Sequence, residues 1–335
     1  MNKVLCFGEL LLRLSPQLGG VWIQNQQMPV FVGGAELNVA TALSNWQVPV
    51  DYMTALPANY LSGEIEQYLS EKNIGTGKII FSGDRIGAYY LPQGADLKNA
   101  GVIYDRAHSS FSHLQPGMID WDLALDGVSW FHFSAISPAL SSQLAAVCKE
   151  GAEAAAGKNI TVSVDLNYRA KLWQYGKQPL EVMRGLVSLC DVVMGNIWAA
   201  EKMLGLPAPG EQKNKEGYIE QSELSSERLV KSFPKCMQVA NTFRFDEGDA
   251  LQYYATLYSE GNLFVSKEHG TNSVIDRVGS GDSFMAGLIY GNYHLLPAQE
   301  TIELAAAAAF AKLFITGDAS TASIDEIRKR YLDHA

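Results

Sequence analysis

The sequence predicts an α/β protein in which a doubly wound, mostly parallel sheet is flanked by helices and carries a small β-sheet lid. Short apolar, strand-like runs alternate with stretches of helical periodicity along most of the 335 residues. Two further segments break this alternation, because they are strand-like but have no helix between them. We therefore expect one domain over residues 1–335 with these two segments inserted as lid strands.

The main elements are expected in a regular order along the chain. Strand-like runs occupy residues 4–9, 50–56, 128–135, 160–167 and 190–196. Helical periodicity is clearest over residues 35–46, 63–73, 141–157, 284–295 and 298–314. The alanine run at 305–309 lies inside the last of these helices, where small side chains permit close packing.

The two lid segments span approximately residues 14–33 and 86–105. They carry Tyr, Val and Ile residues punctuated by Gly and Pro. Each segment leaves the main fold and rejoins it. We therefore expect a small extra sheet that covers the edge of the main sheet, where ligands bind in folds of this class.

Composition and charge exclude several classes of function. The formal net charge of −10 and the absence of a basic run argue against binding to nucleic acid, which needs clustered Lys and Arg. No apolar stretch reaches the roughly 18 residues of a membrane-spanning helix. The cysteines lack Cys-x-x-Cys spacing, so they predict neither a zinc site nor a disulfide framework, and they favour the reducing cytoplasm. These cysteines are Cys6, Cys148, Cys190 and Cys236.

The segment VIDRVGSGDSFMAGLIYG, residues 274–291, carries the strongest chemical signal. Gly279, Ser280 and Gly281 precede a long apolar helix, and amides at such a helix start converge on an anion. The helix dipole should favour the ionised form of Asp282. An ionised carboxylate there suits removal of a hydroxyl proton while a phosphoryl group arrives. Taken alone, the motif also fits a Gly-rich turn with Asp282 as an ordinary helix cap.

Several stretches together carry a family resemblance. Residues 276–282 resemble the C-terminal signature of the ribokinase-like (phosphofructokinase B type) sugar kinases. Residues 33–40, GGAELNVA, are similar to that family's N-terminal Gly-Gly block, and residues 165–169, DLNYR, resemble its Asp-x-Asn-x-Arg motif. The motifs follow the family's order over essentially the whole chain. The resemblance implies an ATP-dependent sugar kinase in which Asp282 is the catalytic base, assisted by the turn Gly279, Ser280 and Gly281.

The resemblance also implies roles for individual residues. Substrate contacts are implied for Gly33, Gly34, Asn38, Tyr89, Tyr104, Arg106, Asn167 and Arg169. Cofactor contacts are implied for Asn196, Thr242, Arg244, Gly279 and Gly281. The implied cofactors are ATP and Mg²⁺, with Asp165 as a metal contact, and a monovalent cation such as K⁺ near Asp276 is a family option. On sequence alone, Tyr89 and Tyr104 fit lid packing equally well. Lid strands in this family often pair between subunits, which suggests a homodimer.

Within the family, three stretches resemble the kinases of 2-keto-3-deoxygluconate: residues 102–107, 165–173 and 276–279. The implied substrate is a six-carbon sugar acid phosphorylated at C6. Arg106 and Arg169 could hold its carboxylate through forked, charge-assisted hydrogen bonds. Three alternatives stay open: Arg106 as a solvated lid residue, Arg169 as a contact to the phosphoryl group, and a neutral sugar such as fructose as the substrate.

One position departs from the family pattern. An Asn-x-x-Glu acid usually helps to organise magnesium, but the chain has Ala199 three residues after Asn196. Glu201 comes two residues later, which turns it about 200° away on a helix. Either Asp165 helps to hold the metal, or metal organisation is weaker, or the protein is a sugar-binding regulator that has lost turnover.

Overall fold

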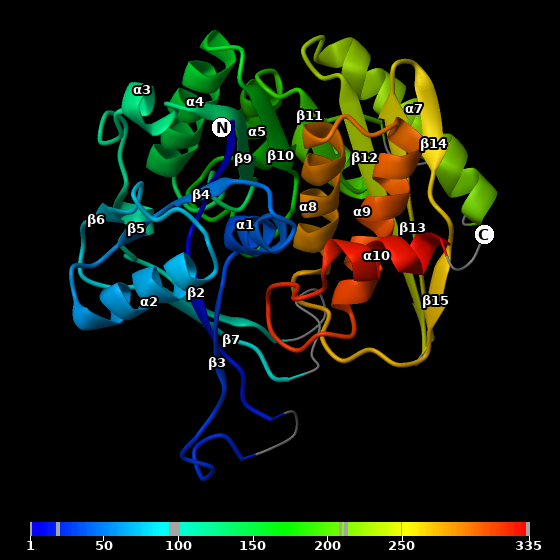
Figure 1. Cartoon of the computed structure of the whole chain (residues 1–335). Coiled ribbons are helices and arrows are strands. Elements are labelled where there is room, and N and C mark those ends of the chain that lie inside the picture. Colours follow the sequence, from blue (N-terminus) through cyan, green and yellow to red (C-terminus); the bar gives the residue numbers. More distant parts are fainter. Residues whose placement is uncertain are drawn as a thin grey trace.

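The computed structural model describes residues 2–17, 21–93, 101–207, 210, 214–248 and 250–332. Its centre is an open sheet in the order β14-β13-β12-β11-β10-β9-β1-β4, with β15 paired to β13 (Figure 1). The strands from β4 to β12 pair in parallel. The bounds are β1 Lys3–Phe7, β4 Val50–Met53, β9 Val128–Ser134, β10 Thr161–Asp165, β11 Val192–Gly195, β12 Gln238–Glu247, β13 Ala250–Ser259, β14 Asn262–Val265 and β15 His269–Thr271.

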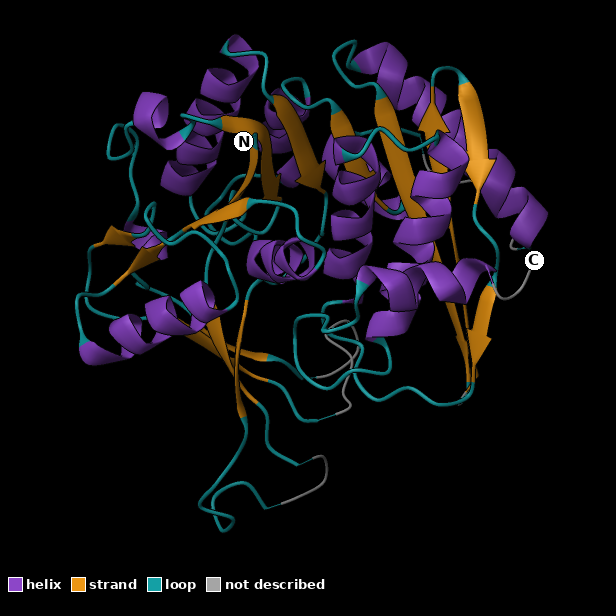
Figure 2. Ribbon diagram, in the orientation of Figure 1, coloured by secondary structure: helices purple, strands orange, loops and turns teal. Residues whose placement is uncertain are grey.

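Helices cover both faces of this sheet (Figure 2). One layer consists of α1 Ala35–Asn45, α2 Tyr60–Glu71, α8 Ser280–Tyr293, α9 Ala298–Lys312 and α10 Ile324–Leu332. The other consists of α3 Trp121–Ala124, α4 Ser142–Gly157, α5 Pro179–Val187, α6 Ile197–Leu204 and α7 Lys215–Ser232, with a short 3₁₀ turn at Phe111–His113. The predicted fold class is thereby confirmed.

The strand sequences explain why the sheet is buried on both faces. In β1, Val4 and Cys6 join the hydrophobic core on one side, whereas Leu5 and Phe7 join the core on the other. Successive side chains of a strand point to opposite faces, so a continuous apolar run supplies both cores at once. All five strand runs and all five helices expected from the sequence are present.

One edge of the main sheet differs from the expectation, which placed no strand after residue 196. From β12 onward the sheet is antiparallel, because β13 returns beside β12 over ten paired residues and then pairs with β14 and β15. No helix separates these strands along the chain. The alternation of strand and helix that predicted the rest of the sheet therefore could not reveal them.

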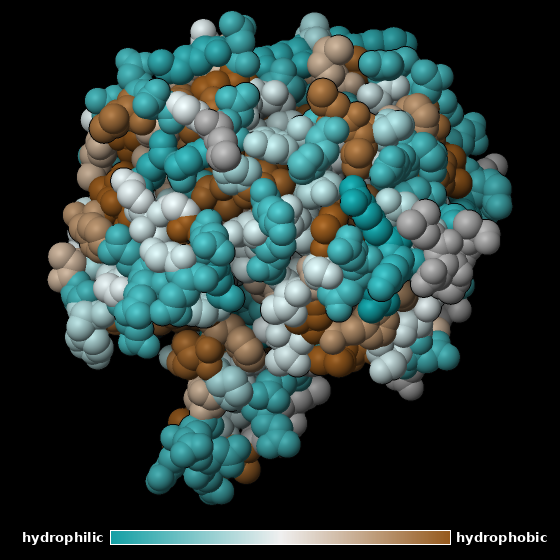
Figure 3. Space-filling model, viewed as in Figure 1, coloured by the Kyte–Doolittle hydropathy of each residue, from teal (hydrophilic) through white to brown (hydrophobic). Residues whose placement is uncertain are grey.

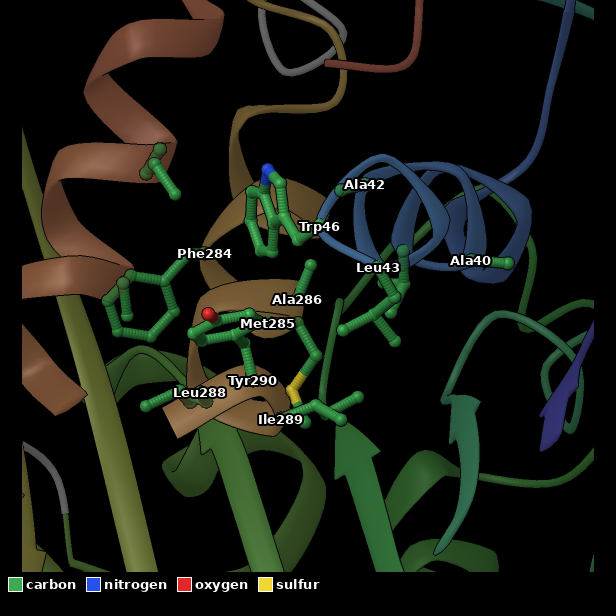
Figure 4. Close-up of a cluster of buried hydrophobic side chains, with 14 of the residues drawn as sticks. Ala40, Ala42, Leu43, Trp46, Phe284, Met285, Ala286, Leu288, Ile289 and Tyr290 are labelled. Atoms are coloured by element: carbon green, nitrogen blue, oxygen red, sulfur yellow. The ribbon is translucent and has the colours of Figure 1, made fainter. Parts of the chain in front are cut away.

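Helix α8 carries the glycine-rich turn at its start and is packed on two sides. A Cβ at Gly287 would lie 2.5 Å from the Cα of Ala305, so α8 and the alanine-rich helix α9 meet backbone to backbone. On its other side α8 packs against α1, where the Trp46 and Tyr290 rings meet edge to face at 5.8 Å (Figure 4). This packing fixes the N-terminal end of α8 in the body of the fold.

The four-stranded small sheet has the order β3-β2-β7-β8 and lies apart from the main sheet. Its strands are β2 Leu11–Leu14, β3 Val30–Gly33, β7 Gly87–Tyr90 and β8 Ile103–Asp105, while β5 Ala55–Leu56 and β6 Ile80–Phe81 form a separate pair. The predicted extra sheet is therefore present, although β2 begins before residue 14. Within the two predicted segments, residues 18–20 and 94–100 lie outside the described residues.

The connection between β2 and β3 projects from the body of the molecule, and its end presents mainly hydrophilic side chains (Figures 1 and 3). Among the described residues, no helix is both long enough and apolar enough to cross a membrane. The four cysteines are buried free thiols, as expected from their spacing.

Candidate active site

A cavity of about 710 Å³ opens between the small sheet, the carboxyl ends of the main-sheet strands and the start of α8. Crevices at this end of an open α/β sheet are the usual ligand sites of such folds. The cavity brings together all the predicted site residues except Gly33. They are Gly34, Asn38, Tyr89, Tyr104, Arg106, Asp165, Asn167, Arg169, Asn196, Thr242, Arg244, Gly279, Ser280, Gly281 and Asp282.

Asp282 lies in the first turn of α8 and faces the cavity. The side-chain amide of Asn38, on α1, donates a 2.6 Å hydrogen bond to Asp282 Oδ2. The Oδ1 atom of Asn38 is buried and has no hydrogen-bond partner among the described residues. A buried acceptor without a partner costs free energy, which a bound hydroxyl group could recover. The pair therefore offers one carboxylate and one vacant acceptor to a ligand.

The protonation of Asp282 differs from the sequence expectation. Burial raises its pKa to about 8, and the nearby carboxylates Asp165 and Glu36 act in the same direction. The Asn38 hydrogen bond and the Arg169 charge lower the pKa but do not compensate. The sequence led us to expect that the helix terminus favours the ionised form of Asp282, whereas burial favours the protonated form and raises the pKa. A carboxyl group with a pKa near the working pH suits a general base.

This pKa predicts how the stability of the ligand-free protein depends on pH. Because the folded-state pKa of Asp282 is raised, the protonated carboxyl contributes stability that is complete below the unfolded pKa of about 3.9 and is lost as the pH rises through about 8. Asp282→Asn should therefore raise the melting temperature over wild type by an amount that grows between about pH 5 and pH 8. Thermal unfolding of both proteins across this range tests it, and a pH-independent difference would contradict the raised pKa.

Contacts with Asp318 and with helix α9 hold the glycine-rich turn in place. Gly279 has a φ of +80°, and a Cβ there would lie 1.7 Å from the carbonyl oxygen of Asp318. The Ser280 hydroxyl donates a 3.0 Å hydrogen bond to the Ala309 carbonyl on α9. A Cβ at Gly281 would instead meet only Met194 Cε, at 4.0 Å. Gly279 is therefore required by the backbone, whereas Gly281 leaves open space on the cavity side of the turn.

The paired glycines before α1 have packing roles that the sequence did not show. A Cβ at Gly33 would lie 2.3 Å from Asp318 Oδ2, and this residue does not line the cavity. The structure thus places Gly33 against Asp318 and outside the cavity lining, so its lack of a side chain makes room for Asp318. Gly34 does line the cavity, with a φ of +141°, and a Cβ there would lie 2.3 Å from the Glu9 carbonyl oxygen.

Arg106 faces the cavity but is already paired with Glu9. Arg106 Nε donates to Glu9 Oε2 at 2.8 Å, and Nη2 contacts the same oxygen. The Ser109 hydroxyl contacts the other carboxylate oxygen of Glu9. Both members of the ion pair are buried. Glu9 lies two residues after the end of β1 and was not identified from the sequence, because a lone acidic residue after a strand forms no motif.

Cationic side chains outnumber carboxyl groups in the cavity lining, although the whole chain is acidic and three of these cations pair with Glu9 or Asp246 outside the lining. Six cationic side chains and three carboxyl groups line the cavity among the described residues. Such a lining attracts anionic ligands and holds them by charge-assisted hydrogen bonds. The cations are Arg106, Arg169, Lys171, Lys202, Arg244 and Arg277, and the acids are Asp165, Asp282 and Asp318. Four of these residues were not identified as site residues from the sequence. Lys202 and Asp318 lie outside any recognisable motif, and Lys171 and Arg277 lie within quoted motifs but were given no role.

The two tyrosines on the small sheet pack against each other with ring centroids 6.4 Å apart. Tyr89 is buried, and its hydroxyl donates a 2.8 Å hydrogen bond to Asp318 Oδ2. Tyr104 is partly buried in the same cluster. The packing alternative for Tyr89 is therefore supported, while both rings still form part of the cavity wall.

The acids expected near a metal ion are distributed as the sequence suggested. Asp165 ends β10 and accepts a 2.9 Å hydrogen bond from the Asn167 amide. Ala199 lines the cavity in the position of the family acid, and Glu201 is not among the lining residues. No group of three metal-ligating side chains occurs among the described residues. The carboxyl groups of Asp165 and Asp282 in the lining match the one or two protein carboxylates that Mg²⁺ often uses beside phosphate groups.

Comparison with known proteins identifies the family. Residues 1–324 match the family model described as pfkB family carbohydrate kinase. The chain belongs to the pfkB family of carbohydrate kinases. This kinase has the ribokinase-like fold, and the resemblance inferred from its motifs is confirmed.

Individual relatives agree with this assignment. The crystal structure of 2-dehydro-3-deoxygluconokinase from Thermotoga maritima is 35% identical, superimposes with a TM-score of 0.90 and covers 99% of this kinase and 100% of that chain. A 2-dehydro-3-deoxygalactonokinase from Haloferax volcanii is 27% identical over 98% of this kinase and 96% of its own length. A 2-dehydro-3-deoxygluconokinase from Bacillus subtilis is 26% identical over 78% and 74%.

Proposed function

We propose that this kinase transfers the γ-phosphate of ATP to the C6 hydroxyl of a 2-keto-3-deoxy sugar acid such as 2-keto-3-deoxygluconate, the synonym of 2-dehydro-3-deoxygluconate. The observation that carries the proposal is the cationic cavity with Asp282 at its floor, directly after an anion-binding turn. The names of the three relatives support this substrate class. Identifying the phosphorylated carbon of the product by NMR tests the position of transfer.

In this mechanism, Asn38 and Asp282 orient the attacking hydroxyl. The hydroxyl approaches Oδ1 of Asn38 and the carboxylate of Asp282, which takes the proton as the hydroxyl oxygen bonds to the γ-phosphorus. The bond from that phosphorus to the β–γ bridging oxygen breaks, and ADP leaves with the bonding electron pair. The amides of Gly279 to Gly281 stabilise the charge on the transferred group. Phosphoryl transfer depends mainly on such positioning and charge stabilisation.

The nucleotide is proposed to lie beside β12 and the start of α6. Thr242 and Arg244 from β12 and Asn196 before α6 line that part of the cavity. Asn196 Oδ1 accepts the Ala199 amide, which leaves its NH₂ group as the donor for a ligand. Mg²⁺ would neutralise phosphate charge. Ala199 stands where the family usually has an acid that helps to organise the metal, so we assign this role to Asp165.

Arg169 is assigned to the transferred phosphoryl group. Arg169 and Asp282 both line the cavity, and the Arg169 charge lowers the pKa of Asp282, which supports a place for the guanidinium near the transferred group. Arg106 is assigned to the substrate carboxylate. Glu9 holds the Nε and Nη2 donors of Arg106 in place before substrate binds. The Nη1 group can therefore donate to the substrate carboxylate with little further loss of side-chain entropy on binding.

Arg106→Ala should chiefly raise the KM for the sugar acid, because the carboxylate contact exists before and during transfer. A charge-assisted contact of roughly 1.5–3 kcal/mol corresponds to about 10- to 150-fold in kcat/KM. The low kcat/KM for a neutral sugar should change little. Steady-state kinetics with 2-keto-3-deoxygluconate and fructose measure the ratio, and an unchanged ratio would remove Arg106 from carboxylate recognition.

Two variants serve as controls for that result. Glu9→Gln keeps a hydrogen-bond acceptor but leaves the Arg106 charge uncompensated, so the preference for the acid should hold or increase. Arg169→Ala should lower kcat for acid and neutral substrates alike. A selective loss with the acid would assign Arg169 to the carboxylate instead.

Two other functions are separated by the same assays. A neutral-sugar kinase would retain the turn and Asp282 but prefer fructose. A sugar-binding regulator, suggested by Ala199, would bind ligand without consuming ATP.

We also propose a homodimer through the small sheet, whose edge strands β3 and β8 expose Val30 and Ile103. Light scattering of the purified protein measures the oligomeric state.

A further inference from the structure

A buried guanidinium joins three distant parts of the chain beside the active site. Arg13 on β2 is 1% exposed. Its Nη2 atom lies 2.7 Å from Asp276 Oδ2, and its Nε atom lies 2.8 Å from Asp318 Oδ1. The face of the guanidinium packs over the Phe31 ring at 4.5 Å. The small sheet, the segment before the anion-binding turn and the loop after α9 therefore meet at one cation.

Asp276, through its carboxylate, and Asp318, through its main chain, contact the backbone around the turn. Asp276 accepts hydrogen bonds from the amides of Val278, at 3.0 Å, and Gly317, at 3.2 Å. The main chain of Asp318 packs directly against Gly279 of the turn. Displacement of Arg13 would leave two buried carboxylates without their ion-pair partner, at a cost that the surroundings could relieve only by moving.

A second buried cation faces the same carboxylates. Lys312 ends α9, has a fully buried side chain and donates a 2.8 Å hydrogen bond to the Ile315 carbonyl. A monovalent cation near Asp276 would need oxygen atoms that are free to coordinate it. The Asp276 oxygens are engaged by Arg13 and two amides, and the Ile315 carbonyl is engaged by Lys312. The side-chain oxygens of Asp276 and the Ile315 carbonyl are therefore already used and are not free to bind the K⁺ that the family resemblance allowed.

We infer that Arg13 is a positioning residue, an internal cation that fixes the anion-binding turn beneath the small sheet, and that this kinase consequently needs no added monovalent cation. Arg13 acts on the nucleotide through Asp276, Asp318 and Gly279 rather than by contact. The inference rests on the proposed function only in placing the phosphate groups at the turn.

The first test uses the wild-type protein with Mg²⁺ and ATP in potassium, sodium or tetramethylammonium salts of equal ionic strength. Turnover and calorimetric ATP affinity should agree within about twofold among the three salts, because general screening is the same in each. A requirement for potassium in either measurement would overturn the inference. If turnover is absent in every salt while the ATP affinity is the same in all three, the proposed function fails but the inference about Arg13 is retained.

The second test compares Arg13→Met with Arg13→Lys and with the control Arg85→Met, which removes an exposed arginine near the small sheet. A displaced turn should lower kcat/KM for ATP by about 10²-fold in Arg13→Met. ATP affinity should fall by about tenfold, the effect of losing one hydrogen bond. Added guanidinium or potassium should restore part of both losses. Arg13→Lys should lose less, and the control should stay within about twofold.

A folded Arg13→Met protein with wild-type kinetics and affinity would overturn the positioning role, as would losses that no added cation relieves. If Arg13→Met does not fold, Asp318→Asn takes its place. This substitution keeps the Arg13 pair with Asp276 while weakening the Arg13 pair with Asp318, the residue whose main chain packs against Gly279. It should lower ATP affinity without changing the thermal transition of the remaining fold, and unchanged affinity would contradict the inference.

Discussion

Replacing Asp282 with Asn should lower kcat by about 10² to 10⁴-fold, the usual contribution of a positioned base. The amide cannot accept the hydroxyl proton, whereas its shape preserves the packing around Asn38. ATP affinity should remain close to that of wild type, because the phosphate groups are assigned to the backbone amides of the turn. Steady-state kinetics and calorimetry measure the two quantities separately.

Asp105→Asn is the matched control for this substitution. Asp105 is an exposed acid on β8 that pairs with Arg85, outside the cavity lining. Its replacement should change kcat by no more than about twofold. Near-normal turnover in Asp282→Asn would remove Asp282 from the role of base. The same variant is expected to gain stability at neutral pH, so a loss of activity combined with a higher melting temperature would separate chemistry from folding.

Gly281→Val should lower the rate of phosphoryl transfer by about 10² to 10³-fold while leaving the fold intact. A bulky residue in such a turn could act by distorting the amides. The structure gives a different reason, because a side chain at Gly281 extends into open space on the cavity side of the turn. It would occupy the volume assigned to the phosphoryl oxygens. Kinetics and thermal unfolding together test this result.

Gly279→Val provides the contrast, since its backbone adopts a φ of +80° and Asp318 lies against it. That variant should lose stability as well as activity. If Gly281→Val retains normal kcat/KM for ATP, the anion-binding role of the turn fails. If instead it unfolds as readily as Gly279→Val, the space seen beside Gly281 is not available to a ligand.

The parts of the site that could be predicted share a property: each lies in a short local pattern. The Gly-Gly block and the Gly-Ser-Gly-Asp turn identified Asn38 and Asp282, which are 244 residues apart yet hydrogen-bonded. The alternation of strands and helices likewise predicted the parallel sheet. Local patterns carry the information because backbone geometry at a helix start restricts which residue types fit.

The parts that were missed depend on contacts between single residues from distant segments. Glu9, Arg13 and Asp318 belong to no motif, and their importance appears only when the small sheet is placed on the loop after α9. Gly33 was assigned to substrate because its neighbour Gly34 does face the cavity. The raised pKa of Asp282 could not be predicted from the sequence either, since burial and neighbouring charges are properties of the folded protein.

The central claim is most directly tested by the wild-type kcat/KM of the purified protein, with Mg²⁺ and ATP, for 2-keto-3-deoxygluconate, 2-keto-3-deoxygalactonate and fructose. We predict ATP-dependent phosphorylation of a sugar acid with a kcat/KM at least about tenfold above that for fructose, as expected from one charge-assisted contact. A preference for fructose would contradict the sugar-acid assignment. The absence of phosphoryl transfer to any of the three substrates would contradict the proposed function itself.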